Sequence, residues 1–135
     1  MGSVRLRRAA PAALLLATFF SSAACDDSPT EPSGQAVATI RVNDETFRIR
    51  LTTPEQIAAA EAARDGGPAN IPVGRIRPGT DVNSGWSWHL EDVTFAETAI
   101  ELCDGVPSMV EREGPSFANG WFCPWGARVI DVRPL

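Results

Sequence analysis

Apolar and polar positions alternate between residues 38 and 51, with a polar run at residues 43–45 in the middle. A period of two places alternate side chains on opposite faces of a strand. Arg48 and Arg50 fall between the apolar residues of the second half. The pattern therefore predicts a β-hairpin that turns at the polar run and has one buried and one solvent-facing side.

Two stretches predict short helices. Thr53 supplies an N-cap and Pro54 a first-turn proline, and an alanine-rich run continues to Arg64 before glycine and proline at residues 65–68 end it. The second helix is expected at residues 107–113, and a loop is expected at 114–120.

Four further stretches predict strands, at residues 71–77, 86–90, 93–103 and 122–132. The third is ambiguous, because its apolar residues could also line a helix. Its β-branched residues and the tight connection at residues 91–92 favour a strand that pairs with residues 86–90. The expected fold class is α+β: a small, mostly antiparallel sheet with two short helices and one disulfide.

The N-terminus has the layout of a lipoprotein-type signal peptide, predicted to span residues 1–24. Arg5, Arg7 and Arg8 precede an apolar run at residues 9–20, and small residues lead to Cys25. We expect cleavage before Cys25 and lipid on its thiol. Ser22 stands where a lipobox usually has leucine, so an ordinary secretory signal is the alternative. The apolar run is shorter than the roughly 20 residues that span a bilayer. Either interpretation exports the domain.

Residues 25–36 are rich in proline, serine and acids, which is typical of a flexible tether. Residues 37–135 are then expected to form a single α+β domain. Three of the twelve basic residues precede Cys25, so nine remain against seventeen acids and leave a net charge of about −8. This acidic balance disfavours nucleic acid and anionic lipid headgroups as partners. Attachment to a membrane would depend on the lipid anchor only.

Cys103 and Cys123 form an even pair in an exported domain, which predicts a disulfide. The alternative is two buried free thiols. Redox catalysis is disfavoured because the chain has no Cys-x-x-Cys spacing.

Residues 86–90 (WSWHL) and 122–125 (FCPW) resemble the most specific segments of a family of exported bacterial domains. That family is similar to the N-terminal domain of a eukaryotic calmodulin-binding protein. The resemblance covers residues 38–131, although the stretch at 113–121 is shorter than usual. It implies a fold and a disulfide, with no established activity. Calmodulin binding is not carried over, because the chain has no arginine-rich amphipathic helix.

His89 is the one histidine of the chain, so general-base chemistry near neutral pH would fall on it. The candidate carboxylate partners are Glu97, Glu101 and Asp104. Ser87 lies two residues away, but no nucleophile elbow accompanies it. Glu97 and Glu101 would lie about 13 Å apart on a strand, too far for paired-carboxylate catalysis. The favoured interpretation is a histidine that is hydrogen-bonded into the strand face.

Four tryptophans are candidates for ligand binding: Trp86, Trp88, Trp121 and Trp125. Core packing is the first interpretation for Trp86 and Trp88. The polar loops that carry aromatics, at residues 83–86 and 116–121, have a composition suited to holding a protein partner or a sugar ring. No metal site and no cofactor are expected, since the chain lacks a calcium-loop motif and has a single histidine.

Together these observations predict an exported, lipid-anchored binding or interaction module in the cell envelope, whose ligand is an unknown protein or small molecule. The alternative is an inhibitor of an exported hydrolase, which would present a rigid loop at residues 67–78 or 83–85. A third hypothesis is a hydrolase-type enzyme that uses His89 with a carboxylate.

Overall fold

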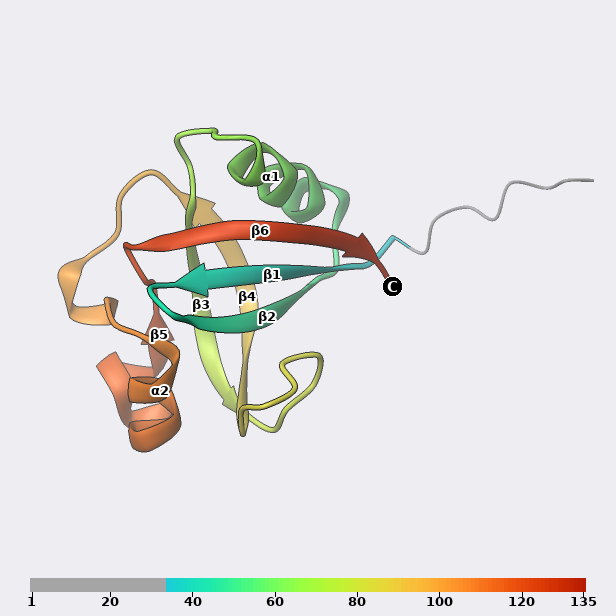
Figure 1. Cartoon of the computed structure of the whole chain (residues 1–135). Coiled ribbons are helices and arrows are strands. Elements are labelled where there is room, and N and C mark those ends of the chain that lie inside the picture. Colours follow the sequence, from blue (N-terminus) through green and yellow to red (C-terminus); the bar gives the residue numbers. More distant parts are fainter. Residues whose placement is uncertain (1–33) are drawn as a thin grey trace, which may run out of the picture.

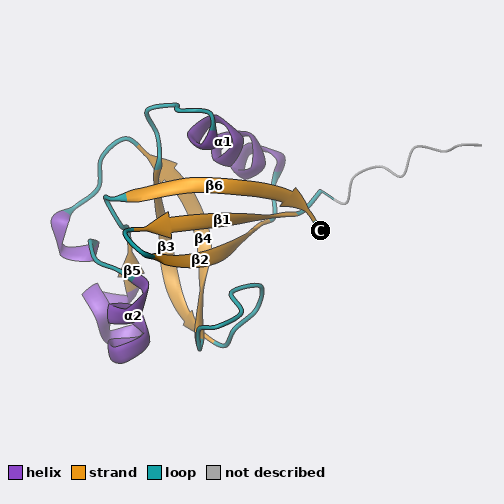
Figure 2. Cartoon of the chain, in the orientation of Figure 1, coloured by secondary structure: helices purple, strands orange, loops and turns teal. Residues whose placement is uncertain are grey.

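The computed structural model describes residues 34–135 (Figures 1 and 2). The strands are β1 (Ala36–Val42), β2 (Glu45–Leu51), β3 (Ile71–Pro78), β4 (Trp88–Ala96), β5 (Trp121–Phe122) and β6 (Ala127–Pro134). The helices are α1 (Pro54–Arg64) and α2 (Pro107–Glu113), and the 3₁₀ segments are η1 (Glu101–Cys103) and η2 (Gly114–Gly120). The predicted signal peptide and Cys25 lie outside the described residues.

The strands form two antiparallel sheets, which we call sheet 1 (β2-β1-β6) and sheet 2 (β4-β3-β5). In Figure 1, sheet 1 lies in front of sheet 2 and its strands run across those of sheet 2. The two predicted helices and the antiparallel pairing are confirmed, whereas the single predicted sheet is wrong. Alternation identifies a strand and its buried face, but it does not say which distant strand will be its neighbour.

The predicted hairpin is confirmed as β1 and β2, which pair from one end to the other. Asn43 takes a φ of +52° in the two-residue turn, a conformation that asparagine adopts more readily than most residues. Phe47 and Ile49 are buried against sheet 2. Arg48 and Arg50 lie on the opposite, outer face of sheet 1, as the alternation predicted.

Helix α1 has the predicted bounds and a complete capping box. The Thr53 side chain accepts a hydrogen bond from the Gln56 N–H, and the Gln56 side chain accepts one from the Thr53 N–H. The Gln56 amide also donates to the Val93 carbonyl at 2.8 Å, which ties the start of the helix to β4. After the helix, Gly67 has no room for a side chain, because a Cβ would lie 2.8 Å from the Ala62 carbonyl oxygen.

Strand β4 runs straight through the point where a hairpin turn was predicted. Residues 86–90 and 93–103 do not pair with each other; β4 lies instead along β3. Asp92 has a φ of +51°, and the register with β3 shifts beside it, so Glu91 and Asp92 form a β-bulge in place of a turn. The strand ends at Ala96, and the predicted strand at residues 97–103 is wrong.

The C-terminal third departs from prediction after α2, whose bounds are confirmed. The Glu45 carboxylate accepts hydrogen bonds from the backbone and hydroxyl of Ser108 and caps that helix from β2. Residues 114–120, expected as a loop, form 3₁₀ turns. The predicted strand at residues 122–132 is divided into β5 and β6. Pro124 lies at the break, where its missing N–H would interrupt a ladder.

The core lies between the two sheets. Phe47 of β2, Trp88 of β4 and Phe122 of β5 meet there, with ring centroids 5.5 to 5.7 Å apart. The buried indole N–H of Trp88 has no hydrogen-bond partner among the described residues. Cys103 and Cys123 form the predicted disulfide, which joins η1 to the residue after β5.

Candidate functional site

His89 lies on β4 with its side chain 18% exposed. Its Nδ1 is 2.7 Å from the Gly79 carbonyl oxygen. A carbonyl only accepts hydrogen bonds, so Nδ1 carries a proton in this contact. The second ring nitrogen, Nε2, faces the Glu91 carboxylate at 3.5 Å. The backbone contact is the structural role that the sequence favoured, and Glu91 is a partner that the sequence did not identify.

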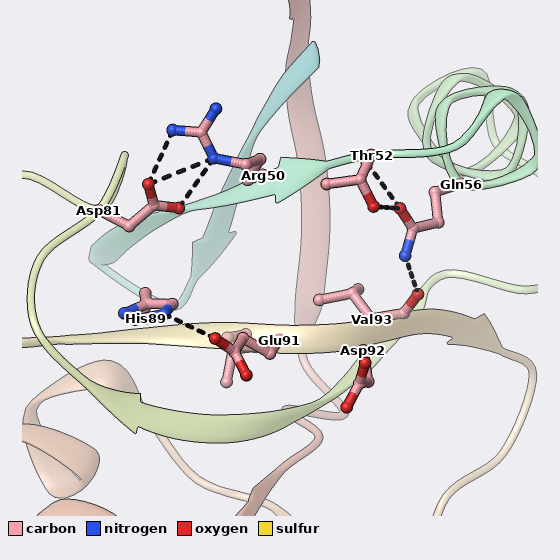
Figure 3. Close-up of a pocket in the computed structure, with 9 residues that line it drawn as sticks. Arg50, Thr52, Gln56, Asp81, His89, Glu91, Asp92 and Val93 are labelled. Atoms are coloured by element: carbon pink, nitrogen blue, oxygen red, sulfur yellow. Dashed lines mark hydrogen bonds and ion pairs between the residues drawn. The ribbon is translucent and has the colours of Figure 1, made fainter. Parts of the chain in front are cut away.

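A pocket of about 490 Å³ lies beside His89 and is shown in Figure 3. Charged side chains line it: Arg50 from β2, Asp81 from the β3–β4 loop, and Glu91 and Asp92 from β4. Most of these charges are already paired. Arg50 donates to both carboxylate oxygens of Asp81 at 2.7 to 3.2 Å. The pocket therefore presents a neutralised network, to which His89 adds one imidazole.

The two pairs affect the carboxylates that they bind. The hydrogen bond from Arg50 lowers the pKa of Asp81 below its ordinary value, against a smaller opposing effect of burial. The hydrogen bond from Arg77, at 2.9 Å, lowers the pKa of Glu91, with a smaller contribution from His89. Both acids are thus held as carboxylates near neutral pH.

The carboxylates and hydroxyl that the sequence offered as partners of His89 are not brought to it. Among residues 34–135, no hydrogen bond or ion pair joins His89 to Glu97, Glu101 or Ser87. Glu97 follows the end of β4 and Glu101 begins η1, because β4 does not fold back on itself. Asp104 accepts hydrogen bonds from the Gly105 and Trp125 backbones, both at 2.8 Å. The geometry that a His-carboxylate enzyme would need from these residues is absent from this part of the chain.

The four tryptophans occupy different environments. Trp88 is in the core, and the half-buried Trp86 donates from its indole to the Thr46 carbonyl at 2.9 Å. Trp121 packs beneath the Arg75 guanidinium, whose carbon is 4.6 Å from the ring centroid. Trp125 is 43% exposed. It is the tryptophan of the described residues that is best placed to meet a ligand.

The outer face of sheet 1 collects arginines from all three of its strands. Five of the nine arginines that follow Cys25 lie there: Arg41, Arg48, Arg50, Arg128 and Arg133. Asp131 is the one acidic residue that the strands of sheet 1 add to this face. In Figure 1 the face is turned toward the reader, and no described helix covers it. We call it the arginine face.

Arg41 of β1 and Arg128 of β6 are direct cross-strand partners on the arginine face. Both are exposed, and neither has an ion pair or a side-chain hydrogen bond within residues 34–135. The other three have partners: Arg48 donates to Ser84, Arg50 to Asp81 and Arg133 to Asp131. Two like charges directly opposite each other on neighbouring strands destabilise a sheet. Within the described part of the chain, Arg41 and Arg128 are therefore the free cations of this face.

A groove of about 570 Å³ lies over this pair, between sheet 1 and the segment that follows α1. Arg41, Arg128 and Arg64 line it, with Asn70 on one wall and Trp125 on another. Its volume is within the range of small-molecule sites, about 300–1,000 Å³. The sequence analysis missed this site, because it treated the arginines as dispersed along strands. The alternation did place Arg48 and Arg50 on one face, but it could not place Arg128 beside Arg41.

Metal ligands and membrane-spanning helices were searched within the same residues. No three His, Cys, Asp or Glu side chains of residues 34–135 are grouped as a metal ion requires. No helix in this part of the chain has both the length and the apolar character to cross a bilayer.

Residues 34–135 match the family model of the N-terminal domain of the calmodulin-binding protein to which the sequence motifs pointed. The match covers most of the chain, so the chain belongs to this family of N-terminal domains, and the resemblance stated from residues 86–90 and 122–125 is confirmed. Neither a curated protein nor a solved structure matches the chain.

Proposed function

We propose that this domain is an exported, lipid-anchored binding module and that the arginine face of sheet 1 binds an anionic ligand of the cell envelope. The signal-peptide pattern before Cys25 supports export and anchoring. The distribution of charge supports the binding role. A domain with an excess of acidic residues places most of its arginines on one face of one sheet.

The observation that carries the proposal is the unpartnered pair Arg41 and Arg128. Guanidinium groups are planar donors that match carboxylate and phosphate oxygens in a bidentate manner. Elsewhere on the domain such forks are satisfied internally, as Arg50 is by Asp81. A cross-strand pair of free arginines is unfavourable in the unliganded protein, and a bound anion removes that repulsion. Binding energy is thereby concentrated where the ligand sits.

The direct test is binding of an anionic polymer to the full chain, expressed in a bacterium and purified after processing. The probes are polygalacturonate and polyglutamate, at low and at physiological ionic strength. We expect binding that weakens as salt rises, because exposed charges are screened beyond about 8–10 Å. The double variant Arg41→Ala/Arg128→Ala should lose it.

The matched control is Arg112→Ala, which removes the same charge from α2, where the Arg112 side chain is 67% exposed. This variant should bind like the wild type. If neither polymer binds, or if Arg112→Ala weakens binding as much as the double variant does, the arginine face is not a specific anion site and the proposal fails.

The anchor has its own test. Cys25→Ser removes the thiol that would carry the lipid, so the protein should leave the membrane fraction and its mass should lack the acyl chains. Wild-type chain that is already free of lipid, or a Cys25→Ser chain that fractionates unchanged, would exclude lipid anchoring. Cleavage after Ala24 without lipid would establish the secreted alternative.

A second candidate function, inhibition of an exported hydrolase, is supported by the loop between β3 and β4. Asn83 is fully buried, accepts from the Arg48 backbone at 2.8 Å and donates to the Trp88 carbonyl at 2.9 Å. These bonds fix the loop while Ser84 and Gly85 remain exposed. A rigid exposed loop is a suitable inhibitory element. The other segment considered, residues 67–78, is mostly strand β3.

Inhibition is tested with hydrolases secreted by the source bacterium, assayed for peptide and glycoside cleavage with and without the full chain. We expect the wild type to lower one of these activities and Ser84→Lys to relieve the effect. Equal inhibition by both proteins, or none by either, would exclude this loop as an inhibitory element.

A further inference from the structure

The groove that contains Arg41 and Arg128 also presents an aromatic ring beside its cations. Trp125 follows the break between β5 and β6 and contributes one wall. Its side chain is among the few large apolar ones that are exposed in residues 34–135, at 43%. An exposed tryptophan next to unpaired arginines is a combination that the core does not require. It therefore calls for a ligand with both a ring face and a negative charge.

The turn that carries Trp125 is held by contacts on both sides. The Trp125 N–H donates to Asp104, which also accepts from the Gly105 N–H. The Cys123 N–H donates to the Cys103 carbonyl at 2.8 Å, and the disulfide links the same two residues. The exposed indole thus extends from a fixed backbone. A side chain presented in this way loses little freedom on binding, which is the condition for a preorganised contact.

The remaining walls add hydrogen-bonding capacity. Asn70 is half-buried, and its side-chain amide has no hydrogen bond within the described residues. Arg64 pairs with Asp65 at 3.0 Å and keeps a side-chain exposure of 37%. An amide can donate to and accept from hydroxyl groups, while the guanidinium groups bind a carboxylate. Together the groove offers a ring platform, a carboxylate site and a partner for hydroxyls.

We propose, as a more specific form of the proposed function and resting on it, that the groove binds a uronic-acid residue of an acidic polysaccharide. The indole of Trp125 packs on the sugar ring, Arg41 and Arg128 bind the carboxylate, and Asn70 bonds a hydroxyl. An acidic peptide would use the two arginines but has no regular ring to place on Trp125. The arginine face continues past the groove through Arg133, which allows further acidic units of one chain to be bound.

The experiment compares polygalacturonate with polyglutamate on the full chain, using the wild type, Trp125→Ala, Trp125→Phe and Arg41→Ala/Arg128→Ala. We expect polygalacturonate to bind more tightly than polyglutamate at the same ionic strength. Trp125→Ala should weaken polygalacturonate binding about tenfold and leave polyglutamate binding unchanged. Trp125→Phe should restore most of the affinity, because it keeps an aromatic face. The double arginine variant should lose both polymers.

The outcomes separate this inference from the proposed function. If the two polymers bind equally and Trp125→Ala changes neither, the face is a general anion site, so the saccharide inference is overturned while the proposed function stands. If polyglutamate binds more tightly, the ligand is an acidic peptide and the inference is again overturned. If neither polymer binds, both proposals fail. Thermal unfolding of Trp125→Ala should match the wild type, since the ring is largely outside the core.

Discussion

The His89 pocket and the Trp125 groove both hold arginines and a ring, yet their charges are arranged in opposite ways. In the His89 pocket, Arg50 binds Asp81, and Glu91 is held by Arg77 and faces His89. In the groove, Arg41 and Arg128 lie opposite each other without a carboxylate. Charges that satisfy one another hold a loop in place, whereas charges left unpaired at exposed positions are available to a ligand. The comparison assigns structure to the first region and binding to the second.

The disulfide gives the largest expected effect. Reduction, or Cys103→Ser/Cys123→Ser, reopens a loop whose ends are 20 residues apart. On the chain-entropy model this lowers the free energy of unfolding by about 3 kcal/mol. Thermal unfolding with and without reductant measures it. Hydrogen exchange should rise first at residues 123–127, which carry Trp125, and much less at residues 79–92. Uniform loosening of both regions would contradict the separation between them.

Asn83 sets the rigidity of the loop beside His89. Asn83→Ala leaves the Arg48 N–H and the Trp88 carbonyl without their partner, so we expect a loss of about 1–3 kcal/mol of stability. Urea unfolding measures the loss, and Ser84→Ala, one residue away at an exposed position, is the control. Affinity for polygalacturonate should be unchanged at protein concentrations where the variant is folded. Weaker binding would show that the loop contributes to the groove.

Arginines on the same face should differ in sign. Arg50→Ala breaks a bidentate pair and should destabilise the domain by about 1 kcal/mol or less, because the pair is partly exposed. Arg41→Ala relieves repulsion from Arg128 and should leave stability unchanged or raise it by a few tenths of a kcal/mol. Urea unfolding at low ionic strength distinguishes them. A loss for Arg41→Ala as large as that for Arg50→Ala would mean that Arg41 is a structural residue.

The smallest expected effect is the pH dependence of the Arg50–Asp81 pair. The pKa of Asp81 is lowered in the folded protein, so the unfolded chain takes up the proton first as the pH falls. The stabilisation is therefore complete above the ordinary aspartate pKa and is lost as the pH falls through the lowered value. Asp81→Asn should be less stable than the wild type at pH 7 and equal to it near pH 2. A constant difference across that range would contradict the role of the pair.

The sequence predicted the parts of the fold that depend on nearby residues. The hairpin followed from alternation, α1 from Thr53 and Pro54, and the disulfide from the count of cysteines. The path of β4 could not be predicted in this way, because Glu91 and Asp92 suit a bulge as well as a turn. Which of the two forms depends on whether β3 is available as a neighbour, and that is a long-range property.

The site was harder to predict than the fold for the same reason. His89 attracted interest because it is the single histidine, but its partner Glu91 lies two residues away on its own strand. The arginine pair depends on β6 lying beside β1, which residues 122–132 do not indicate locally. Trp125 was named as a candidate, and its exposure became evident only once the turn after Cys123 was placed.

The most direct test of this account is the affinity of the full chain for polygalacturonate, measured by calorimetry for the wild type, Arg41→Ala/Arg128→Ala and Arg112→Ala. The account predicts salt-dependent binding to the wild type and Arg112→Ala, with loss of at least tenfold in the double variant. Equal affinity of all three proteins, or no binding to any of them, would contradict the claim that the unpaired arginines of sheet 1 form a binding site.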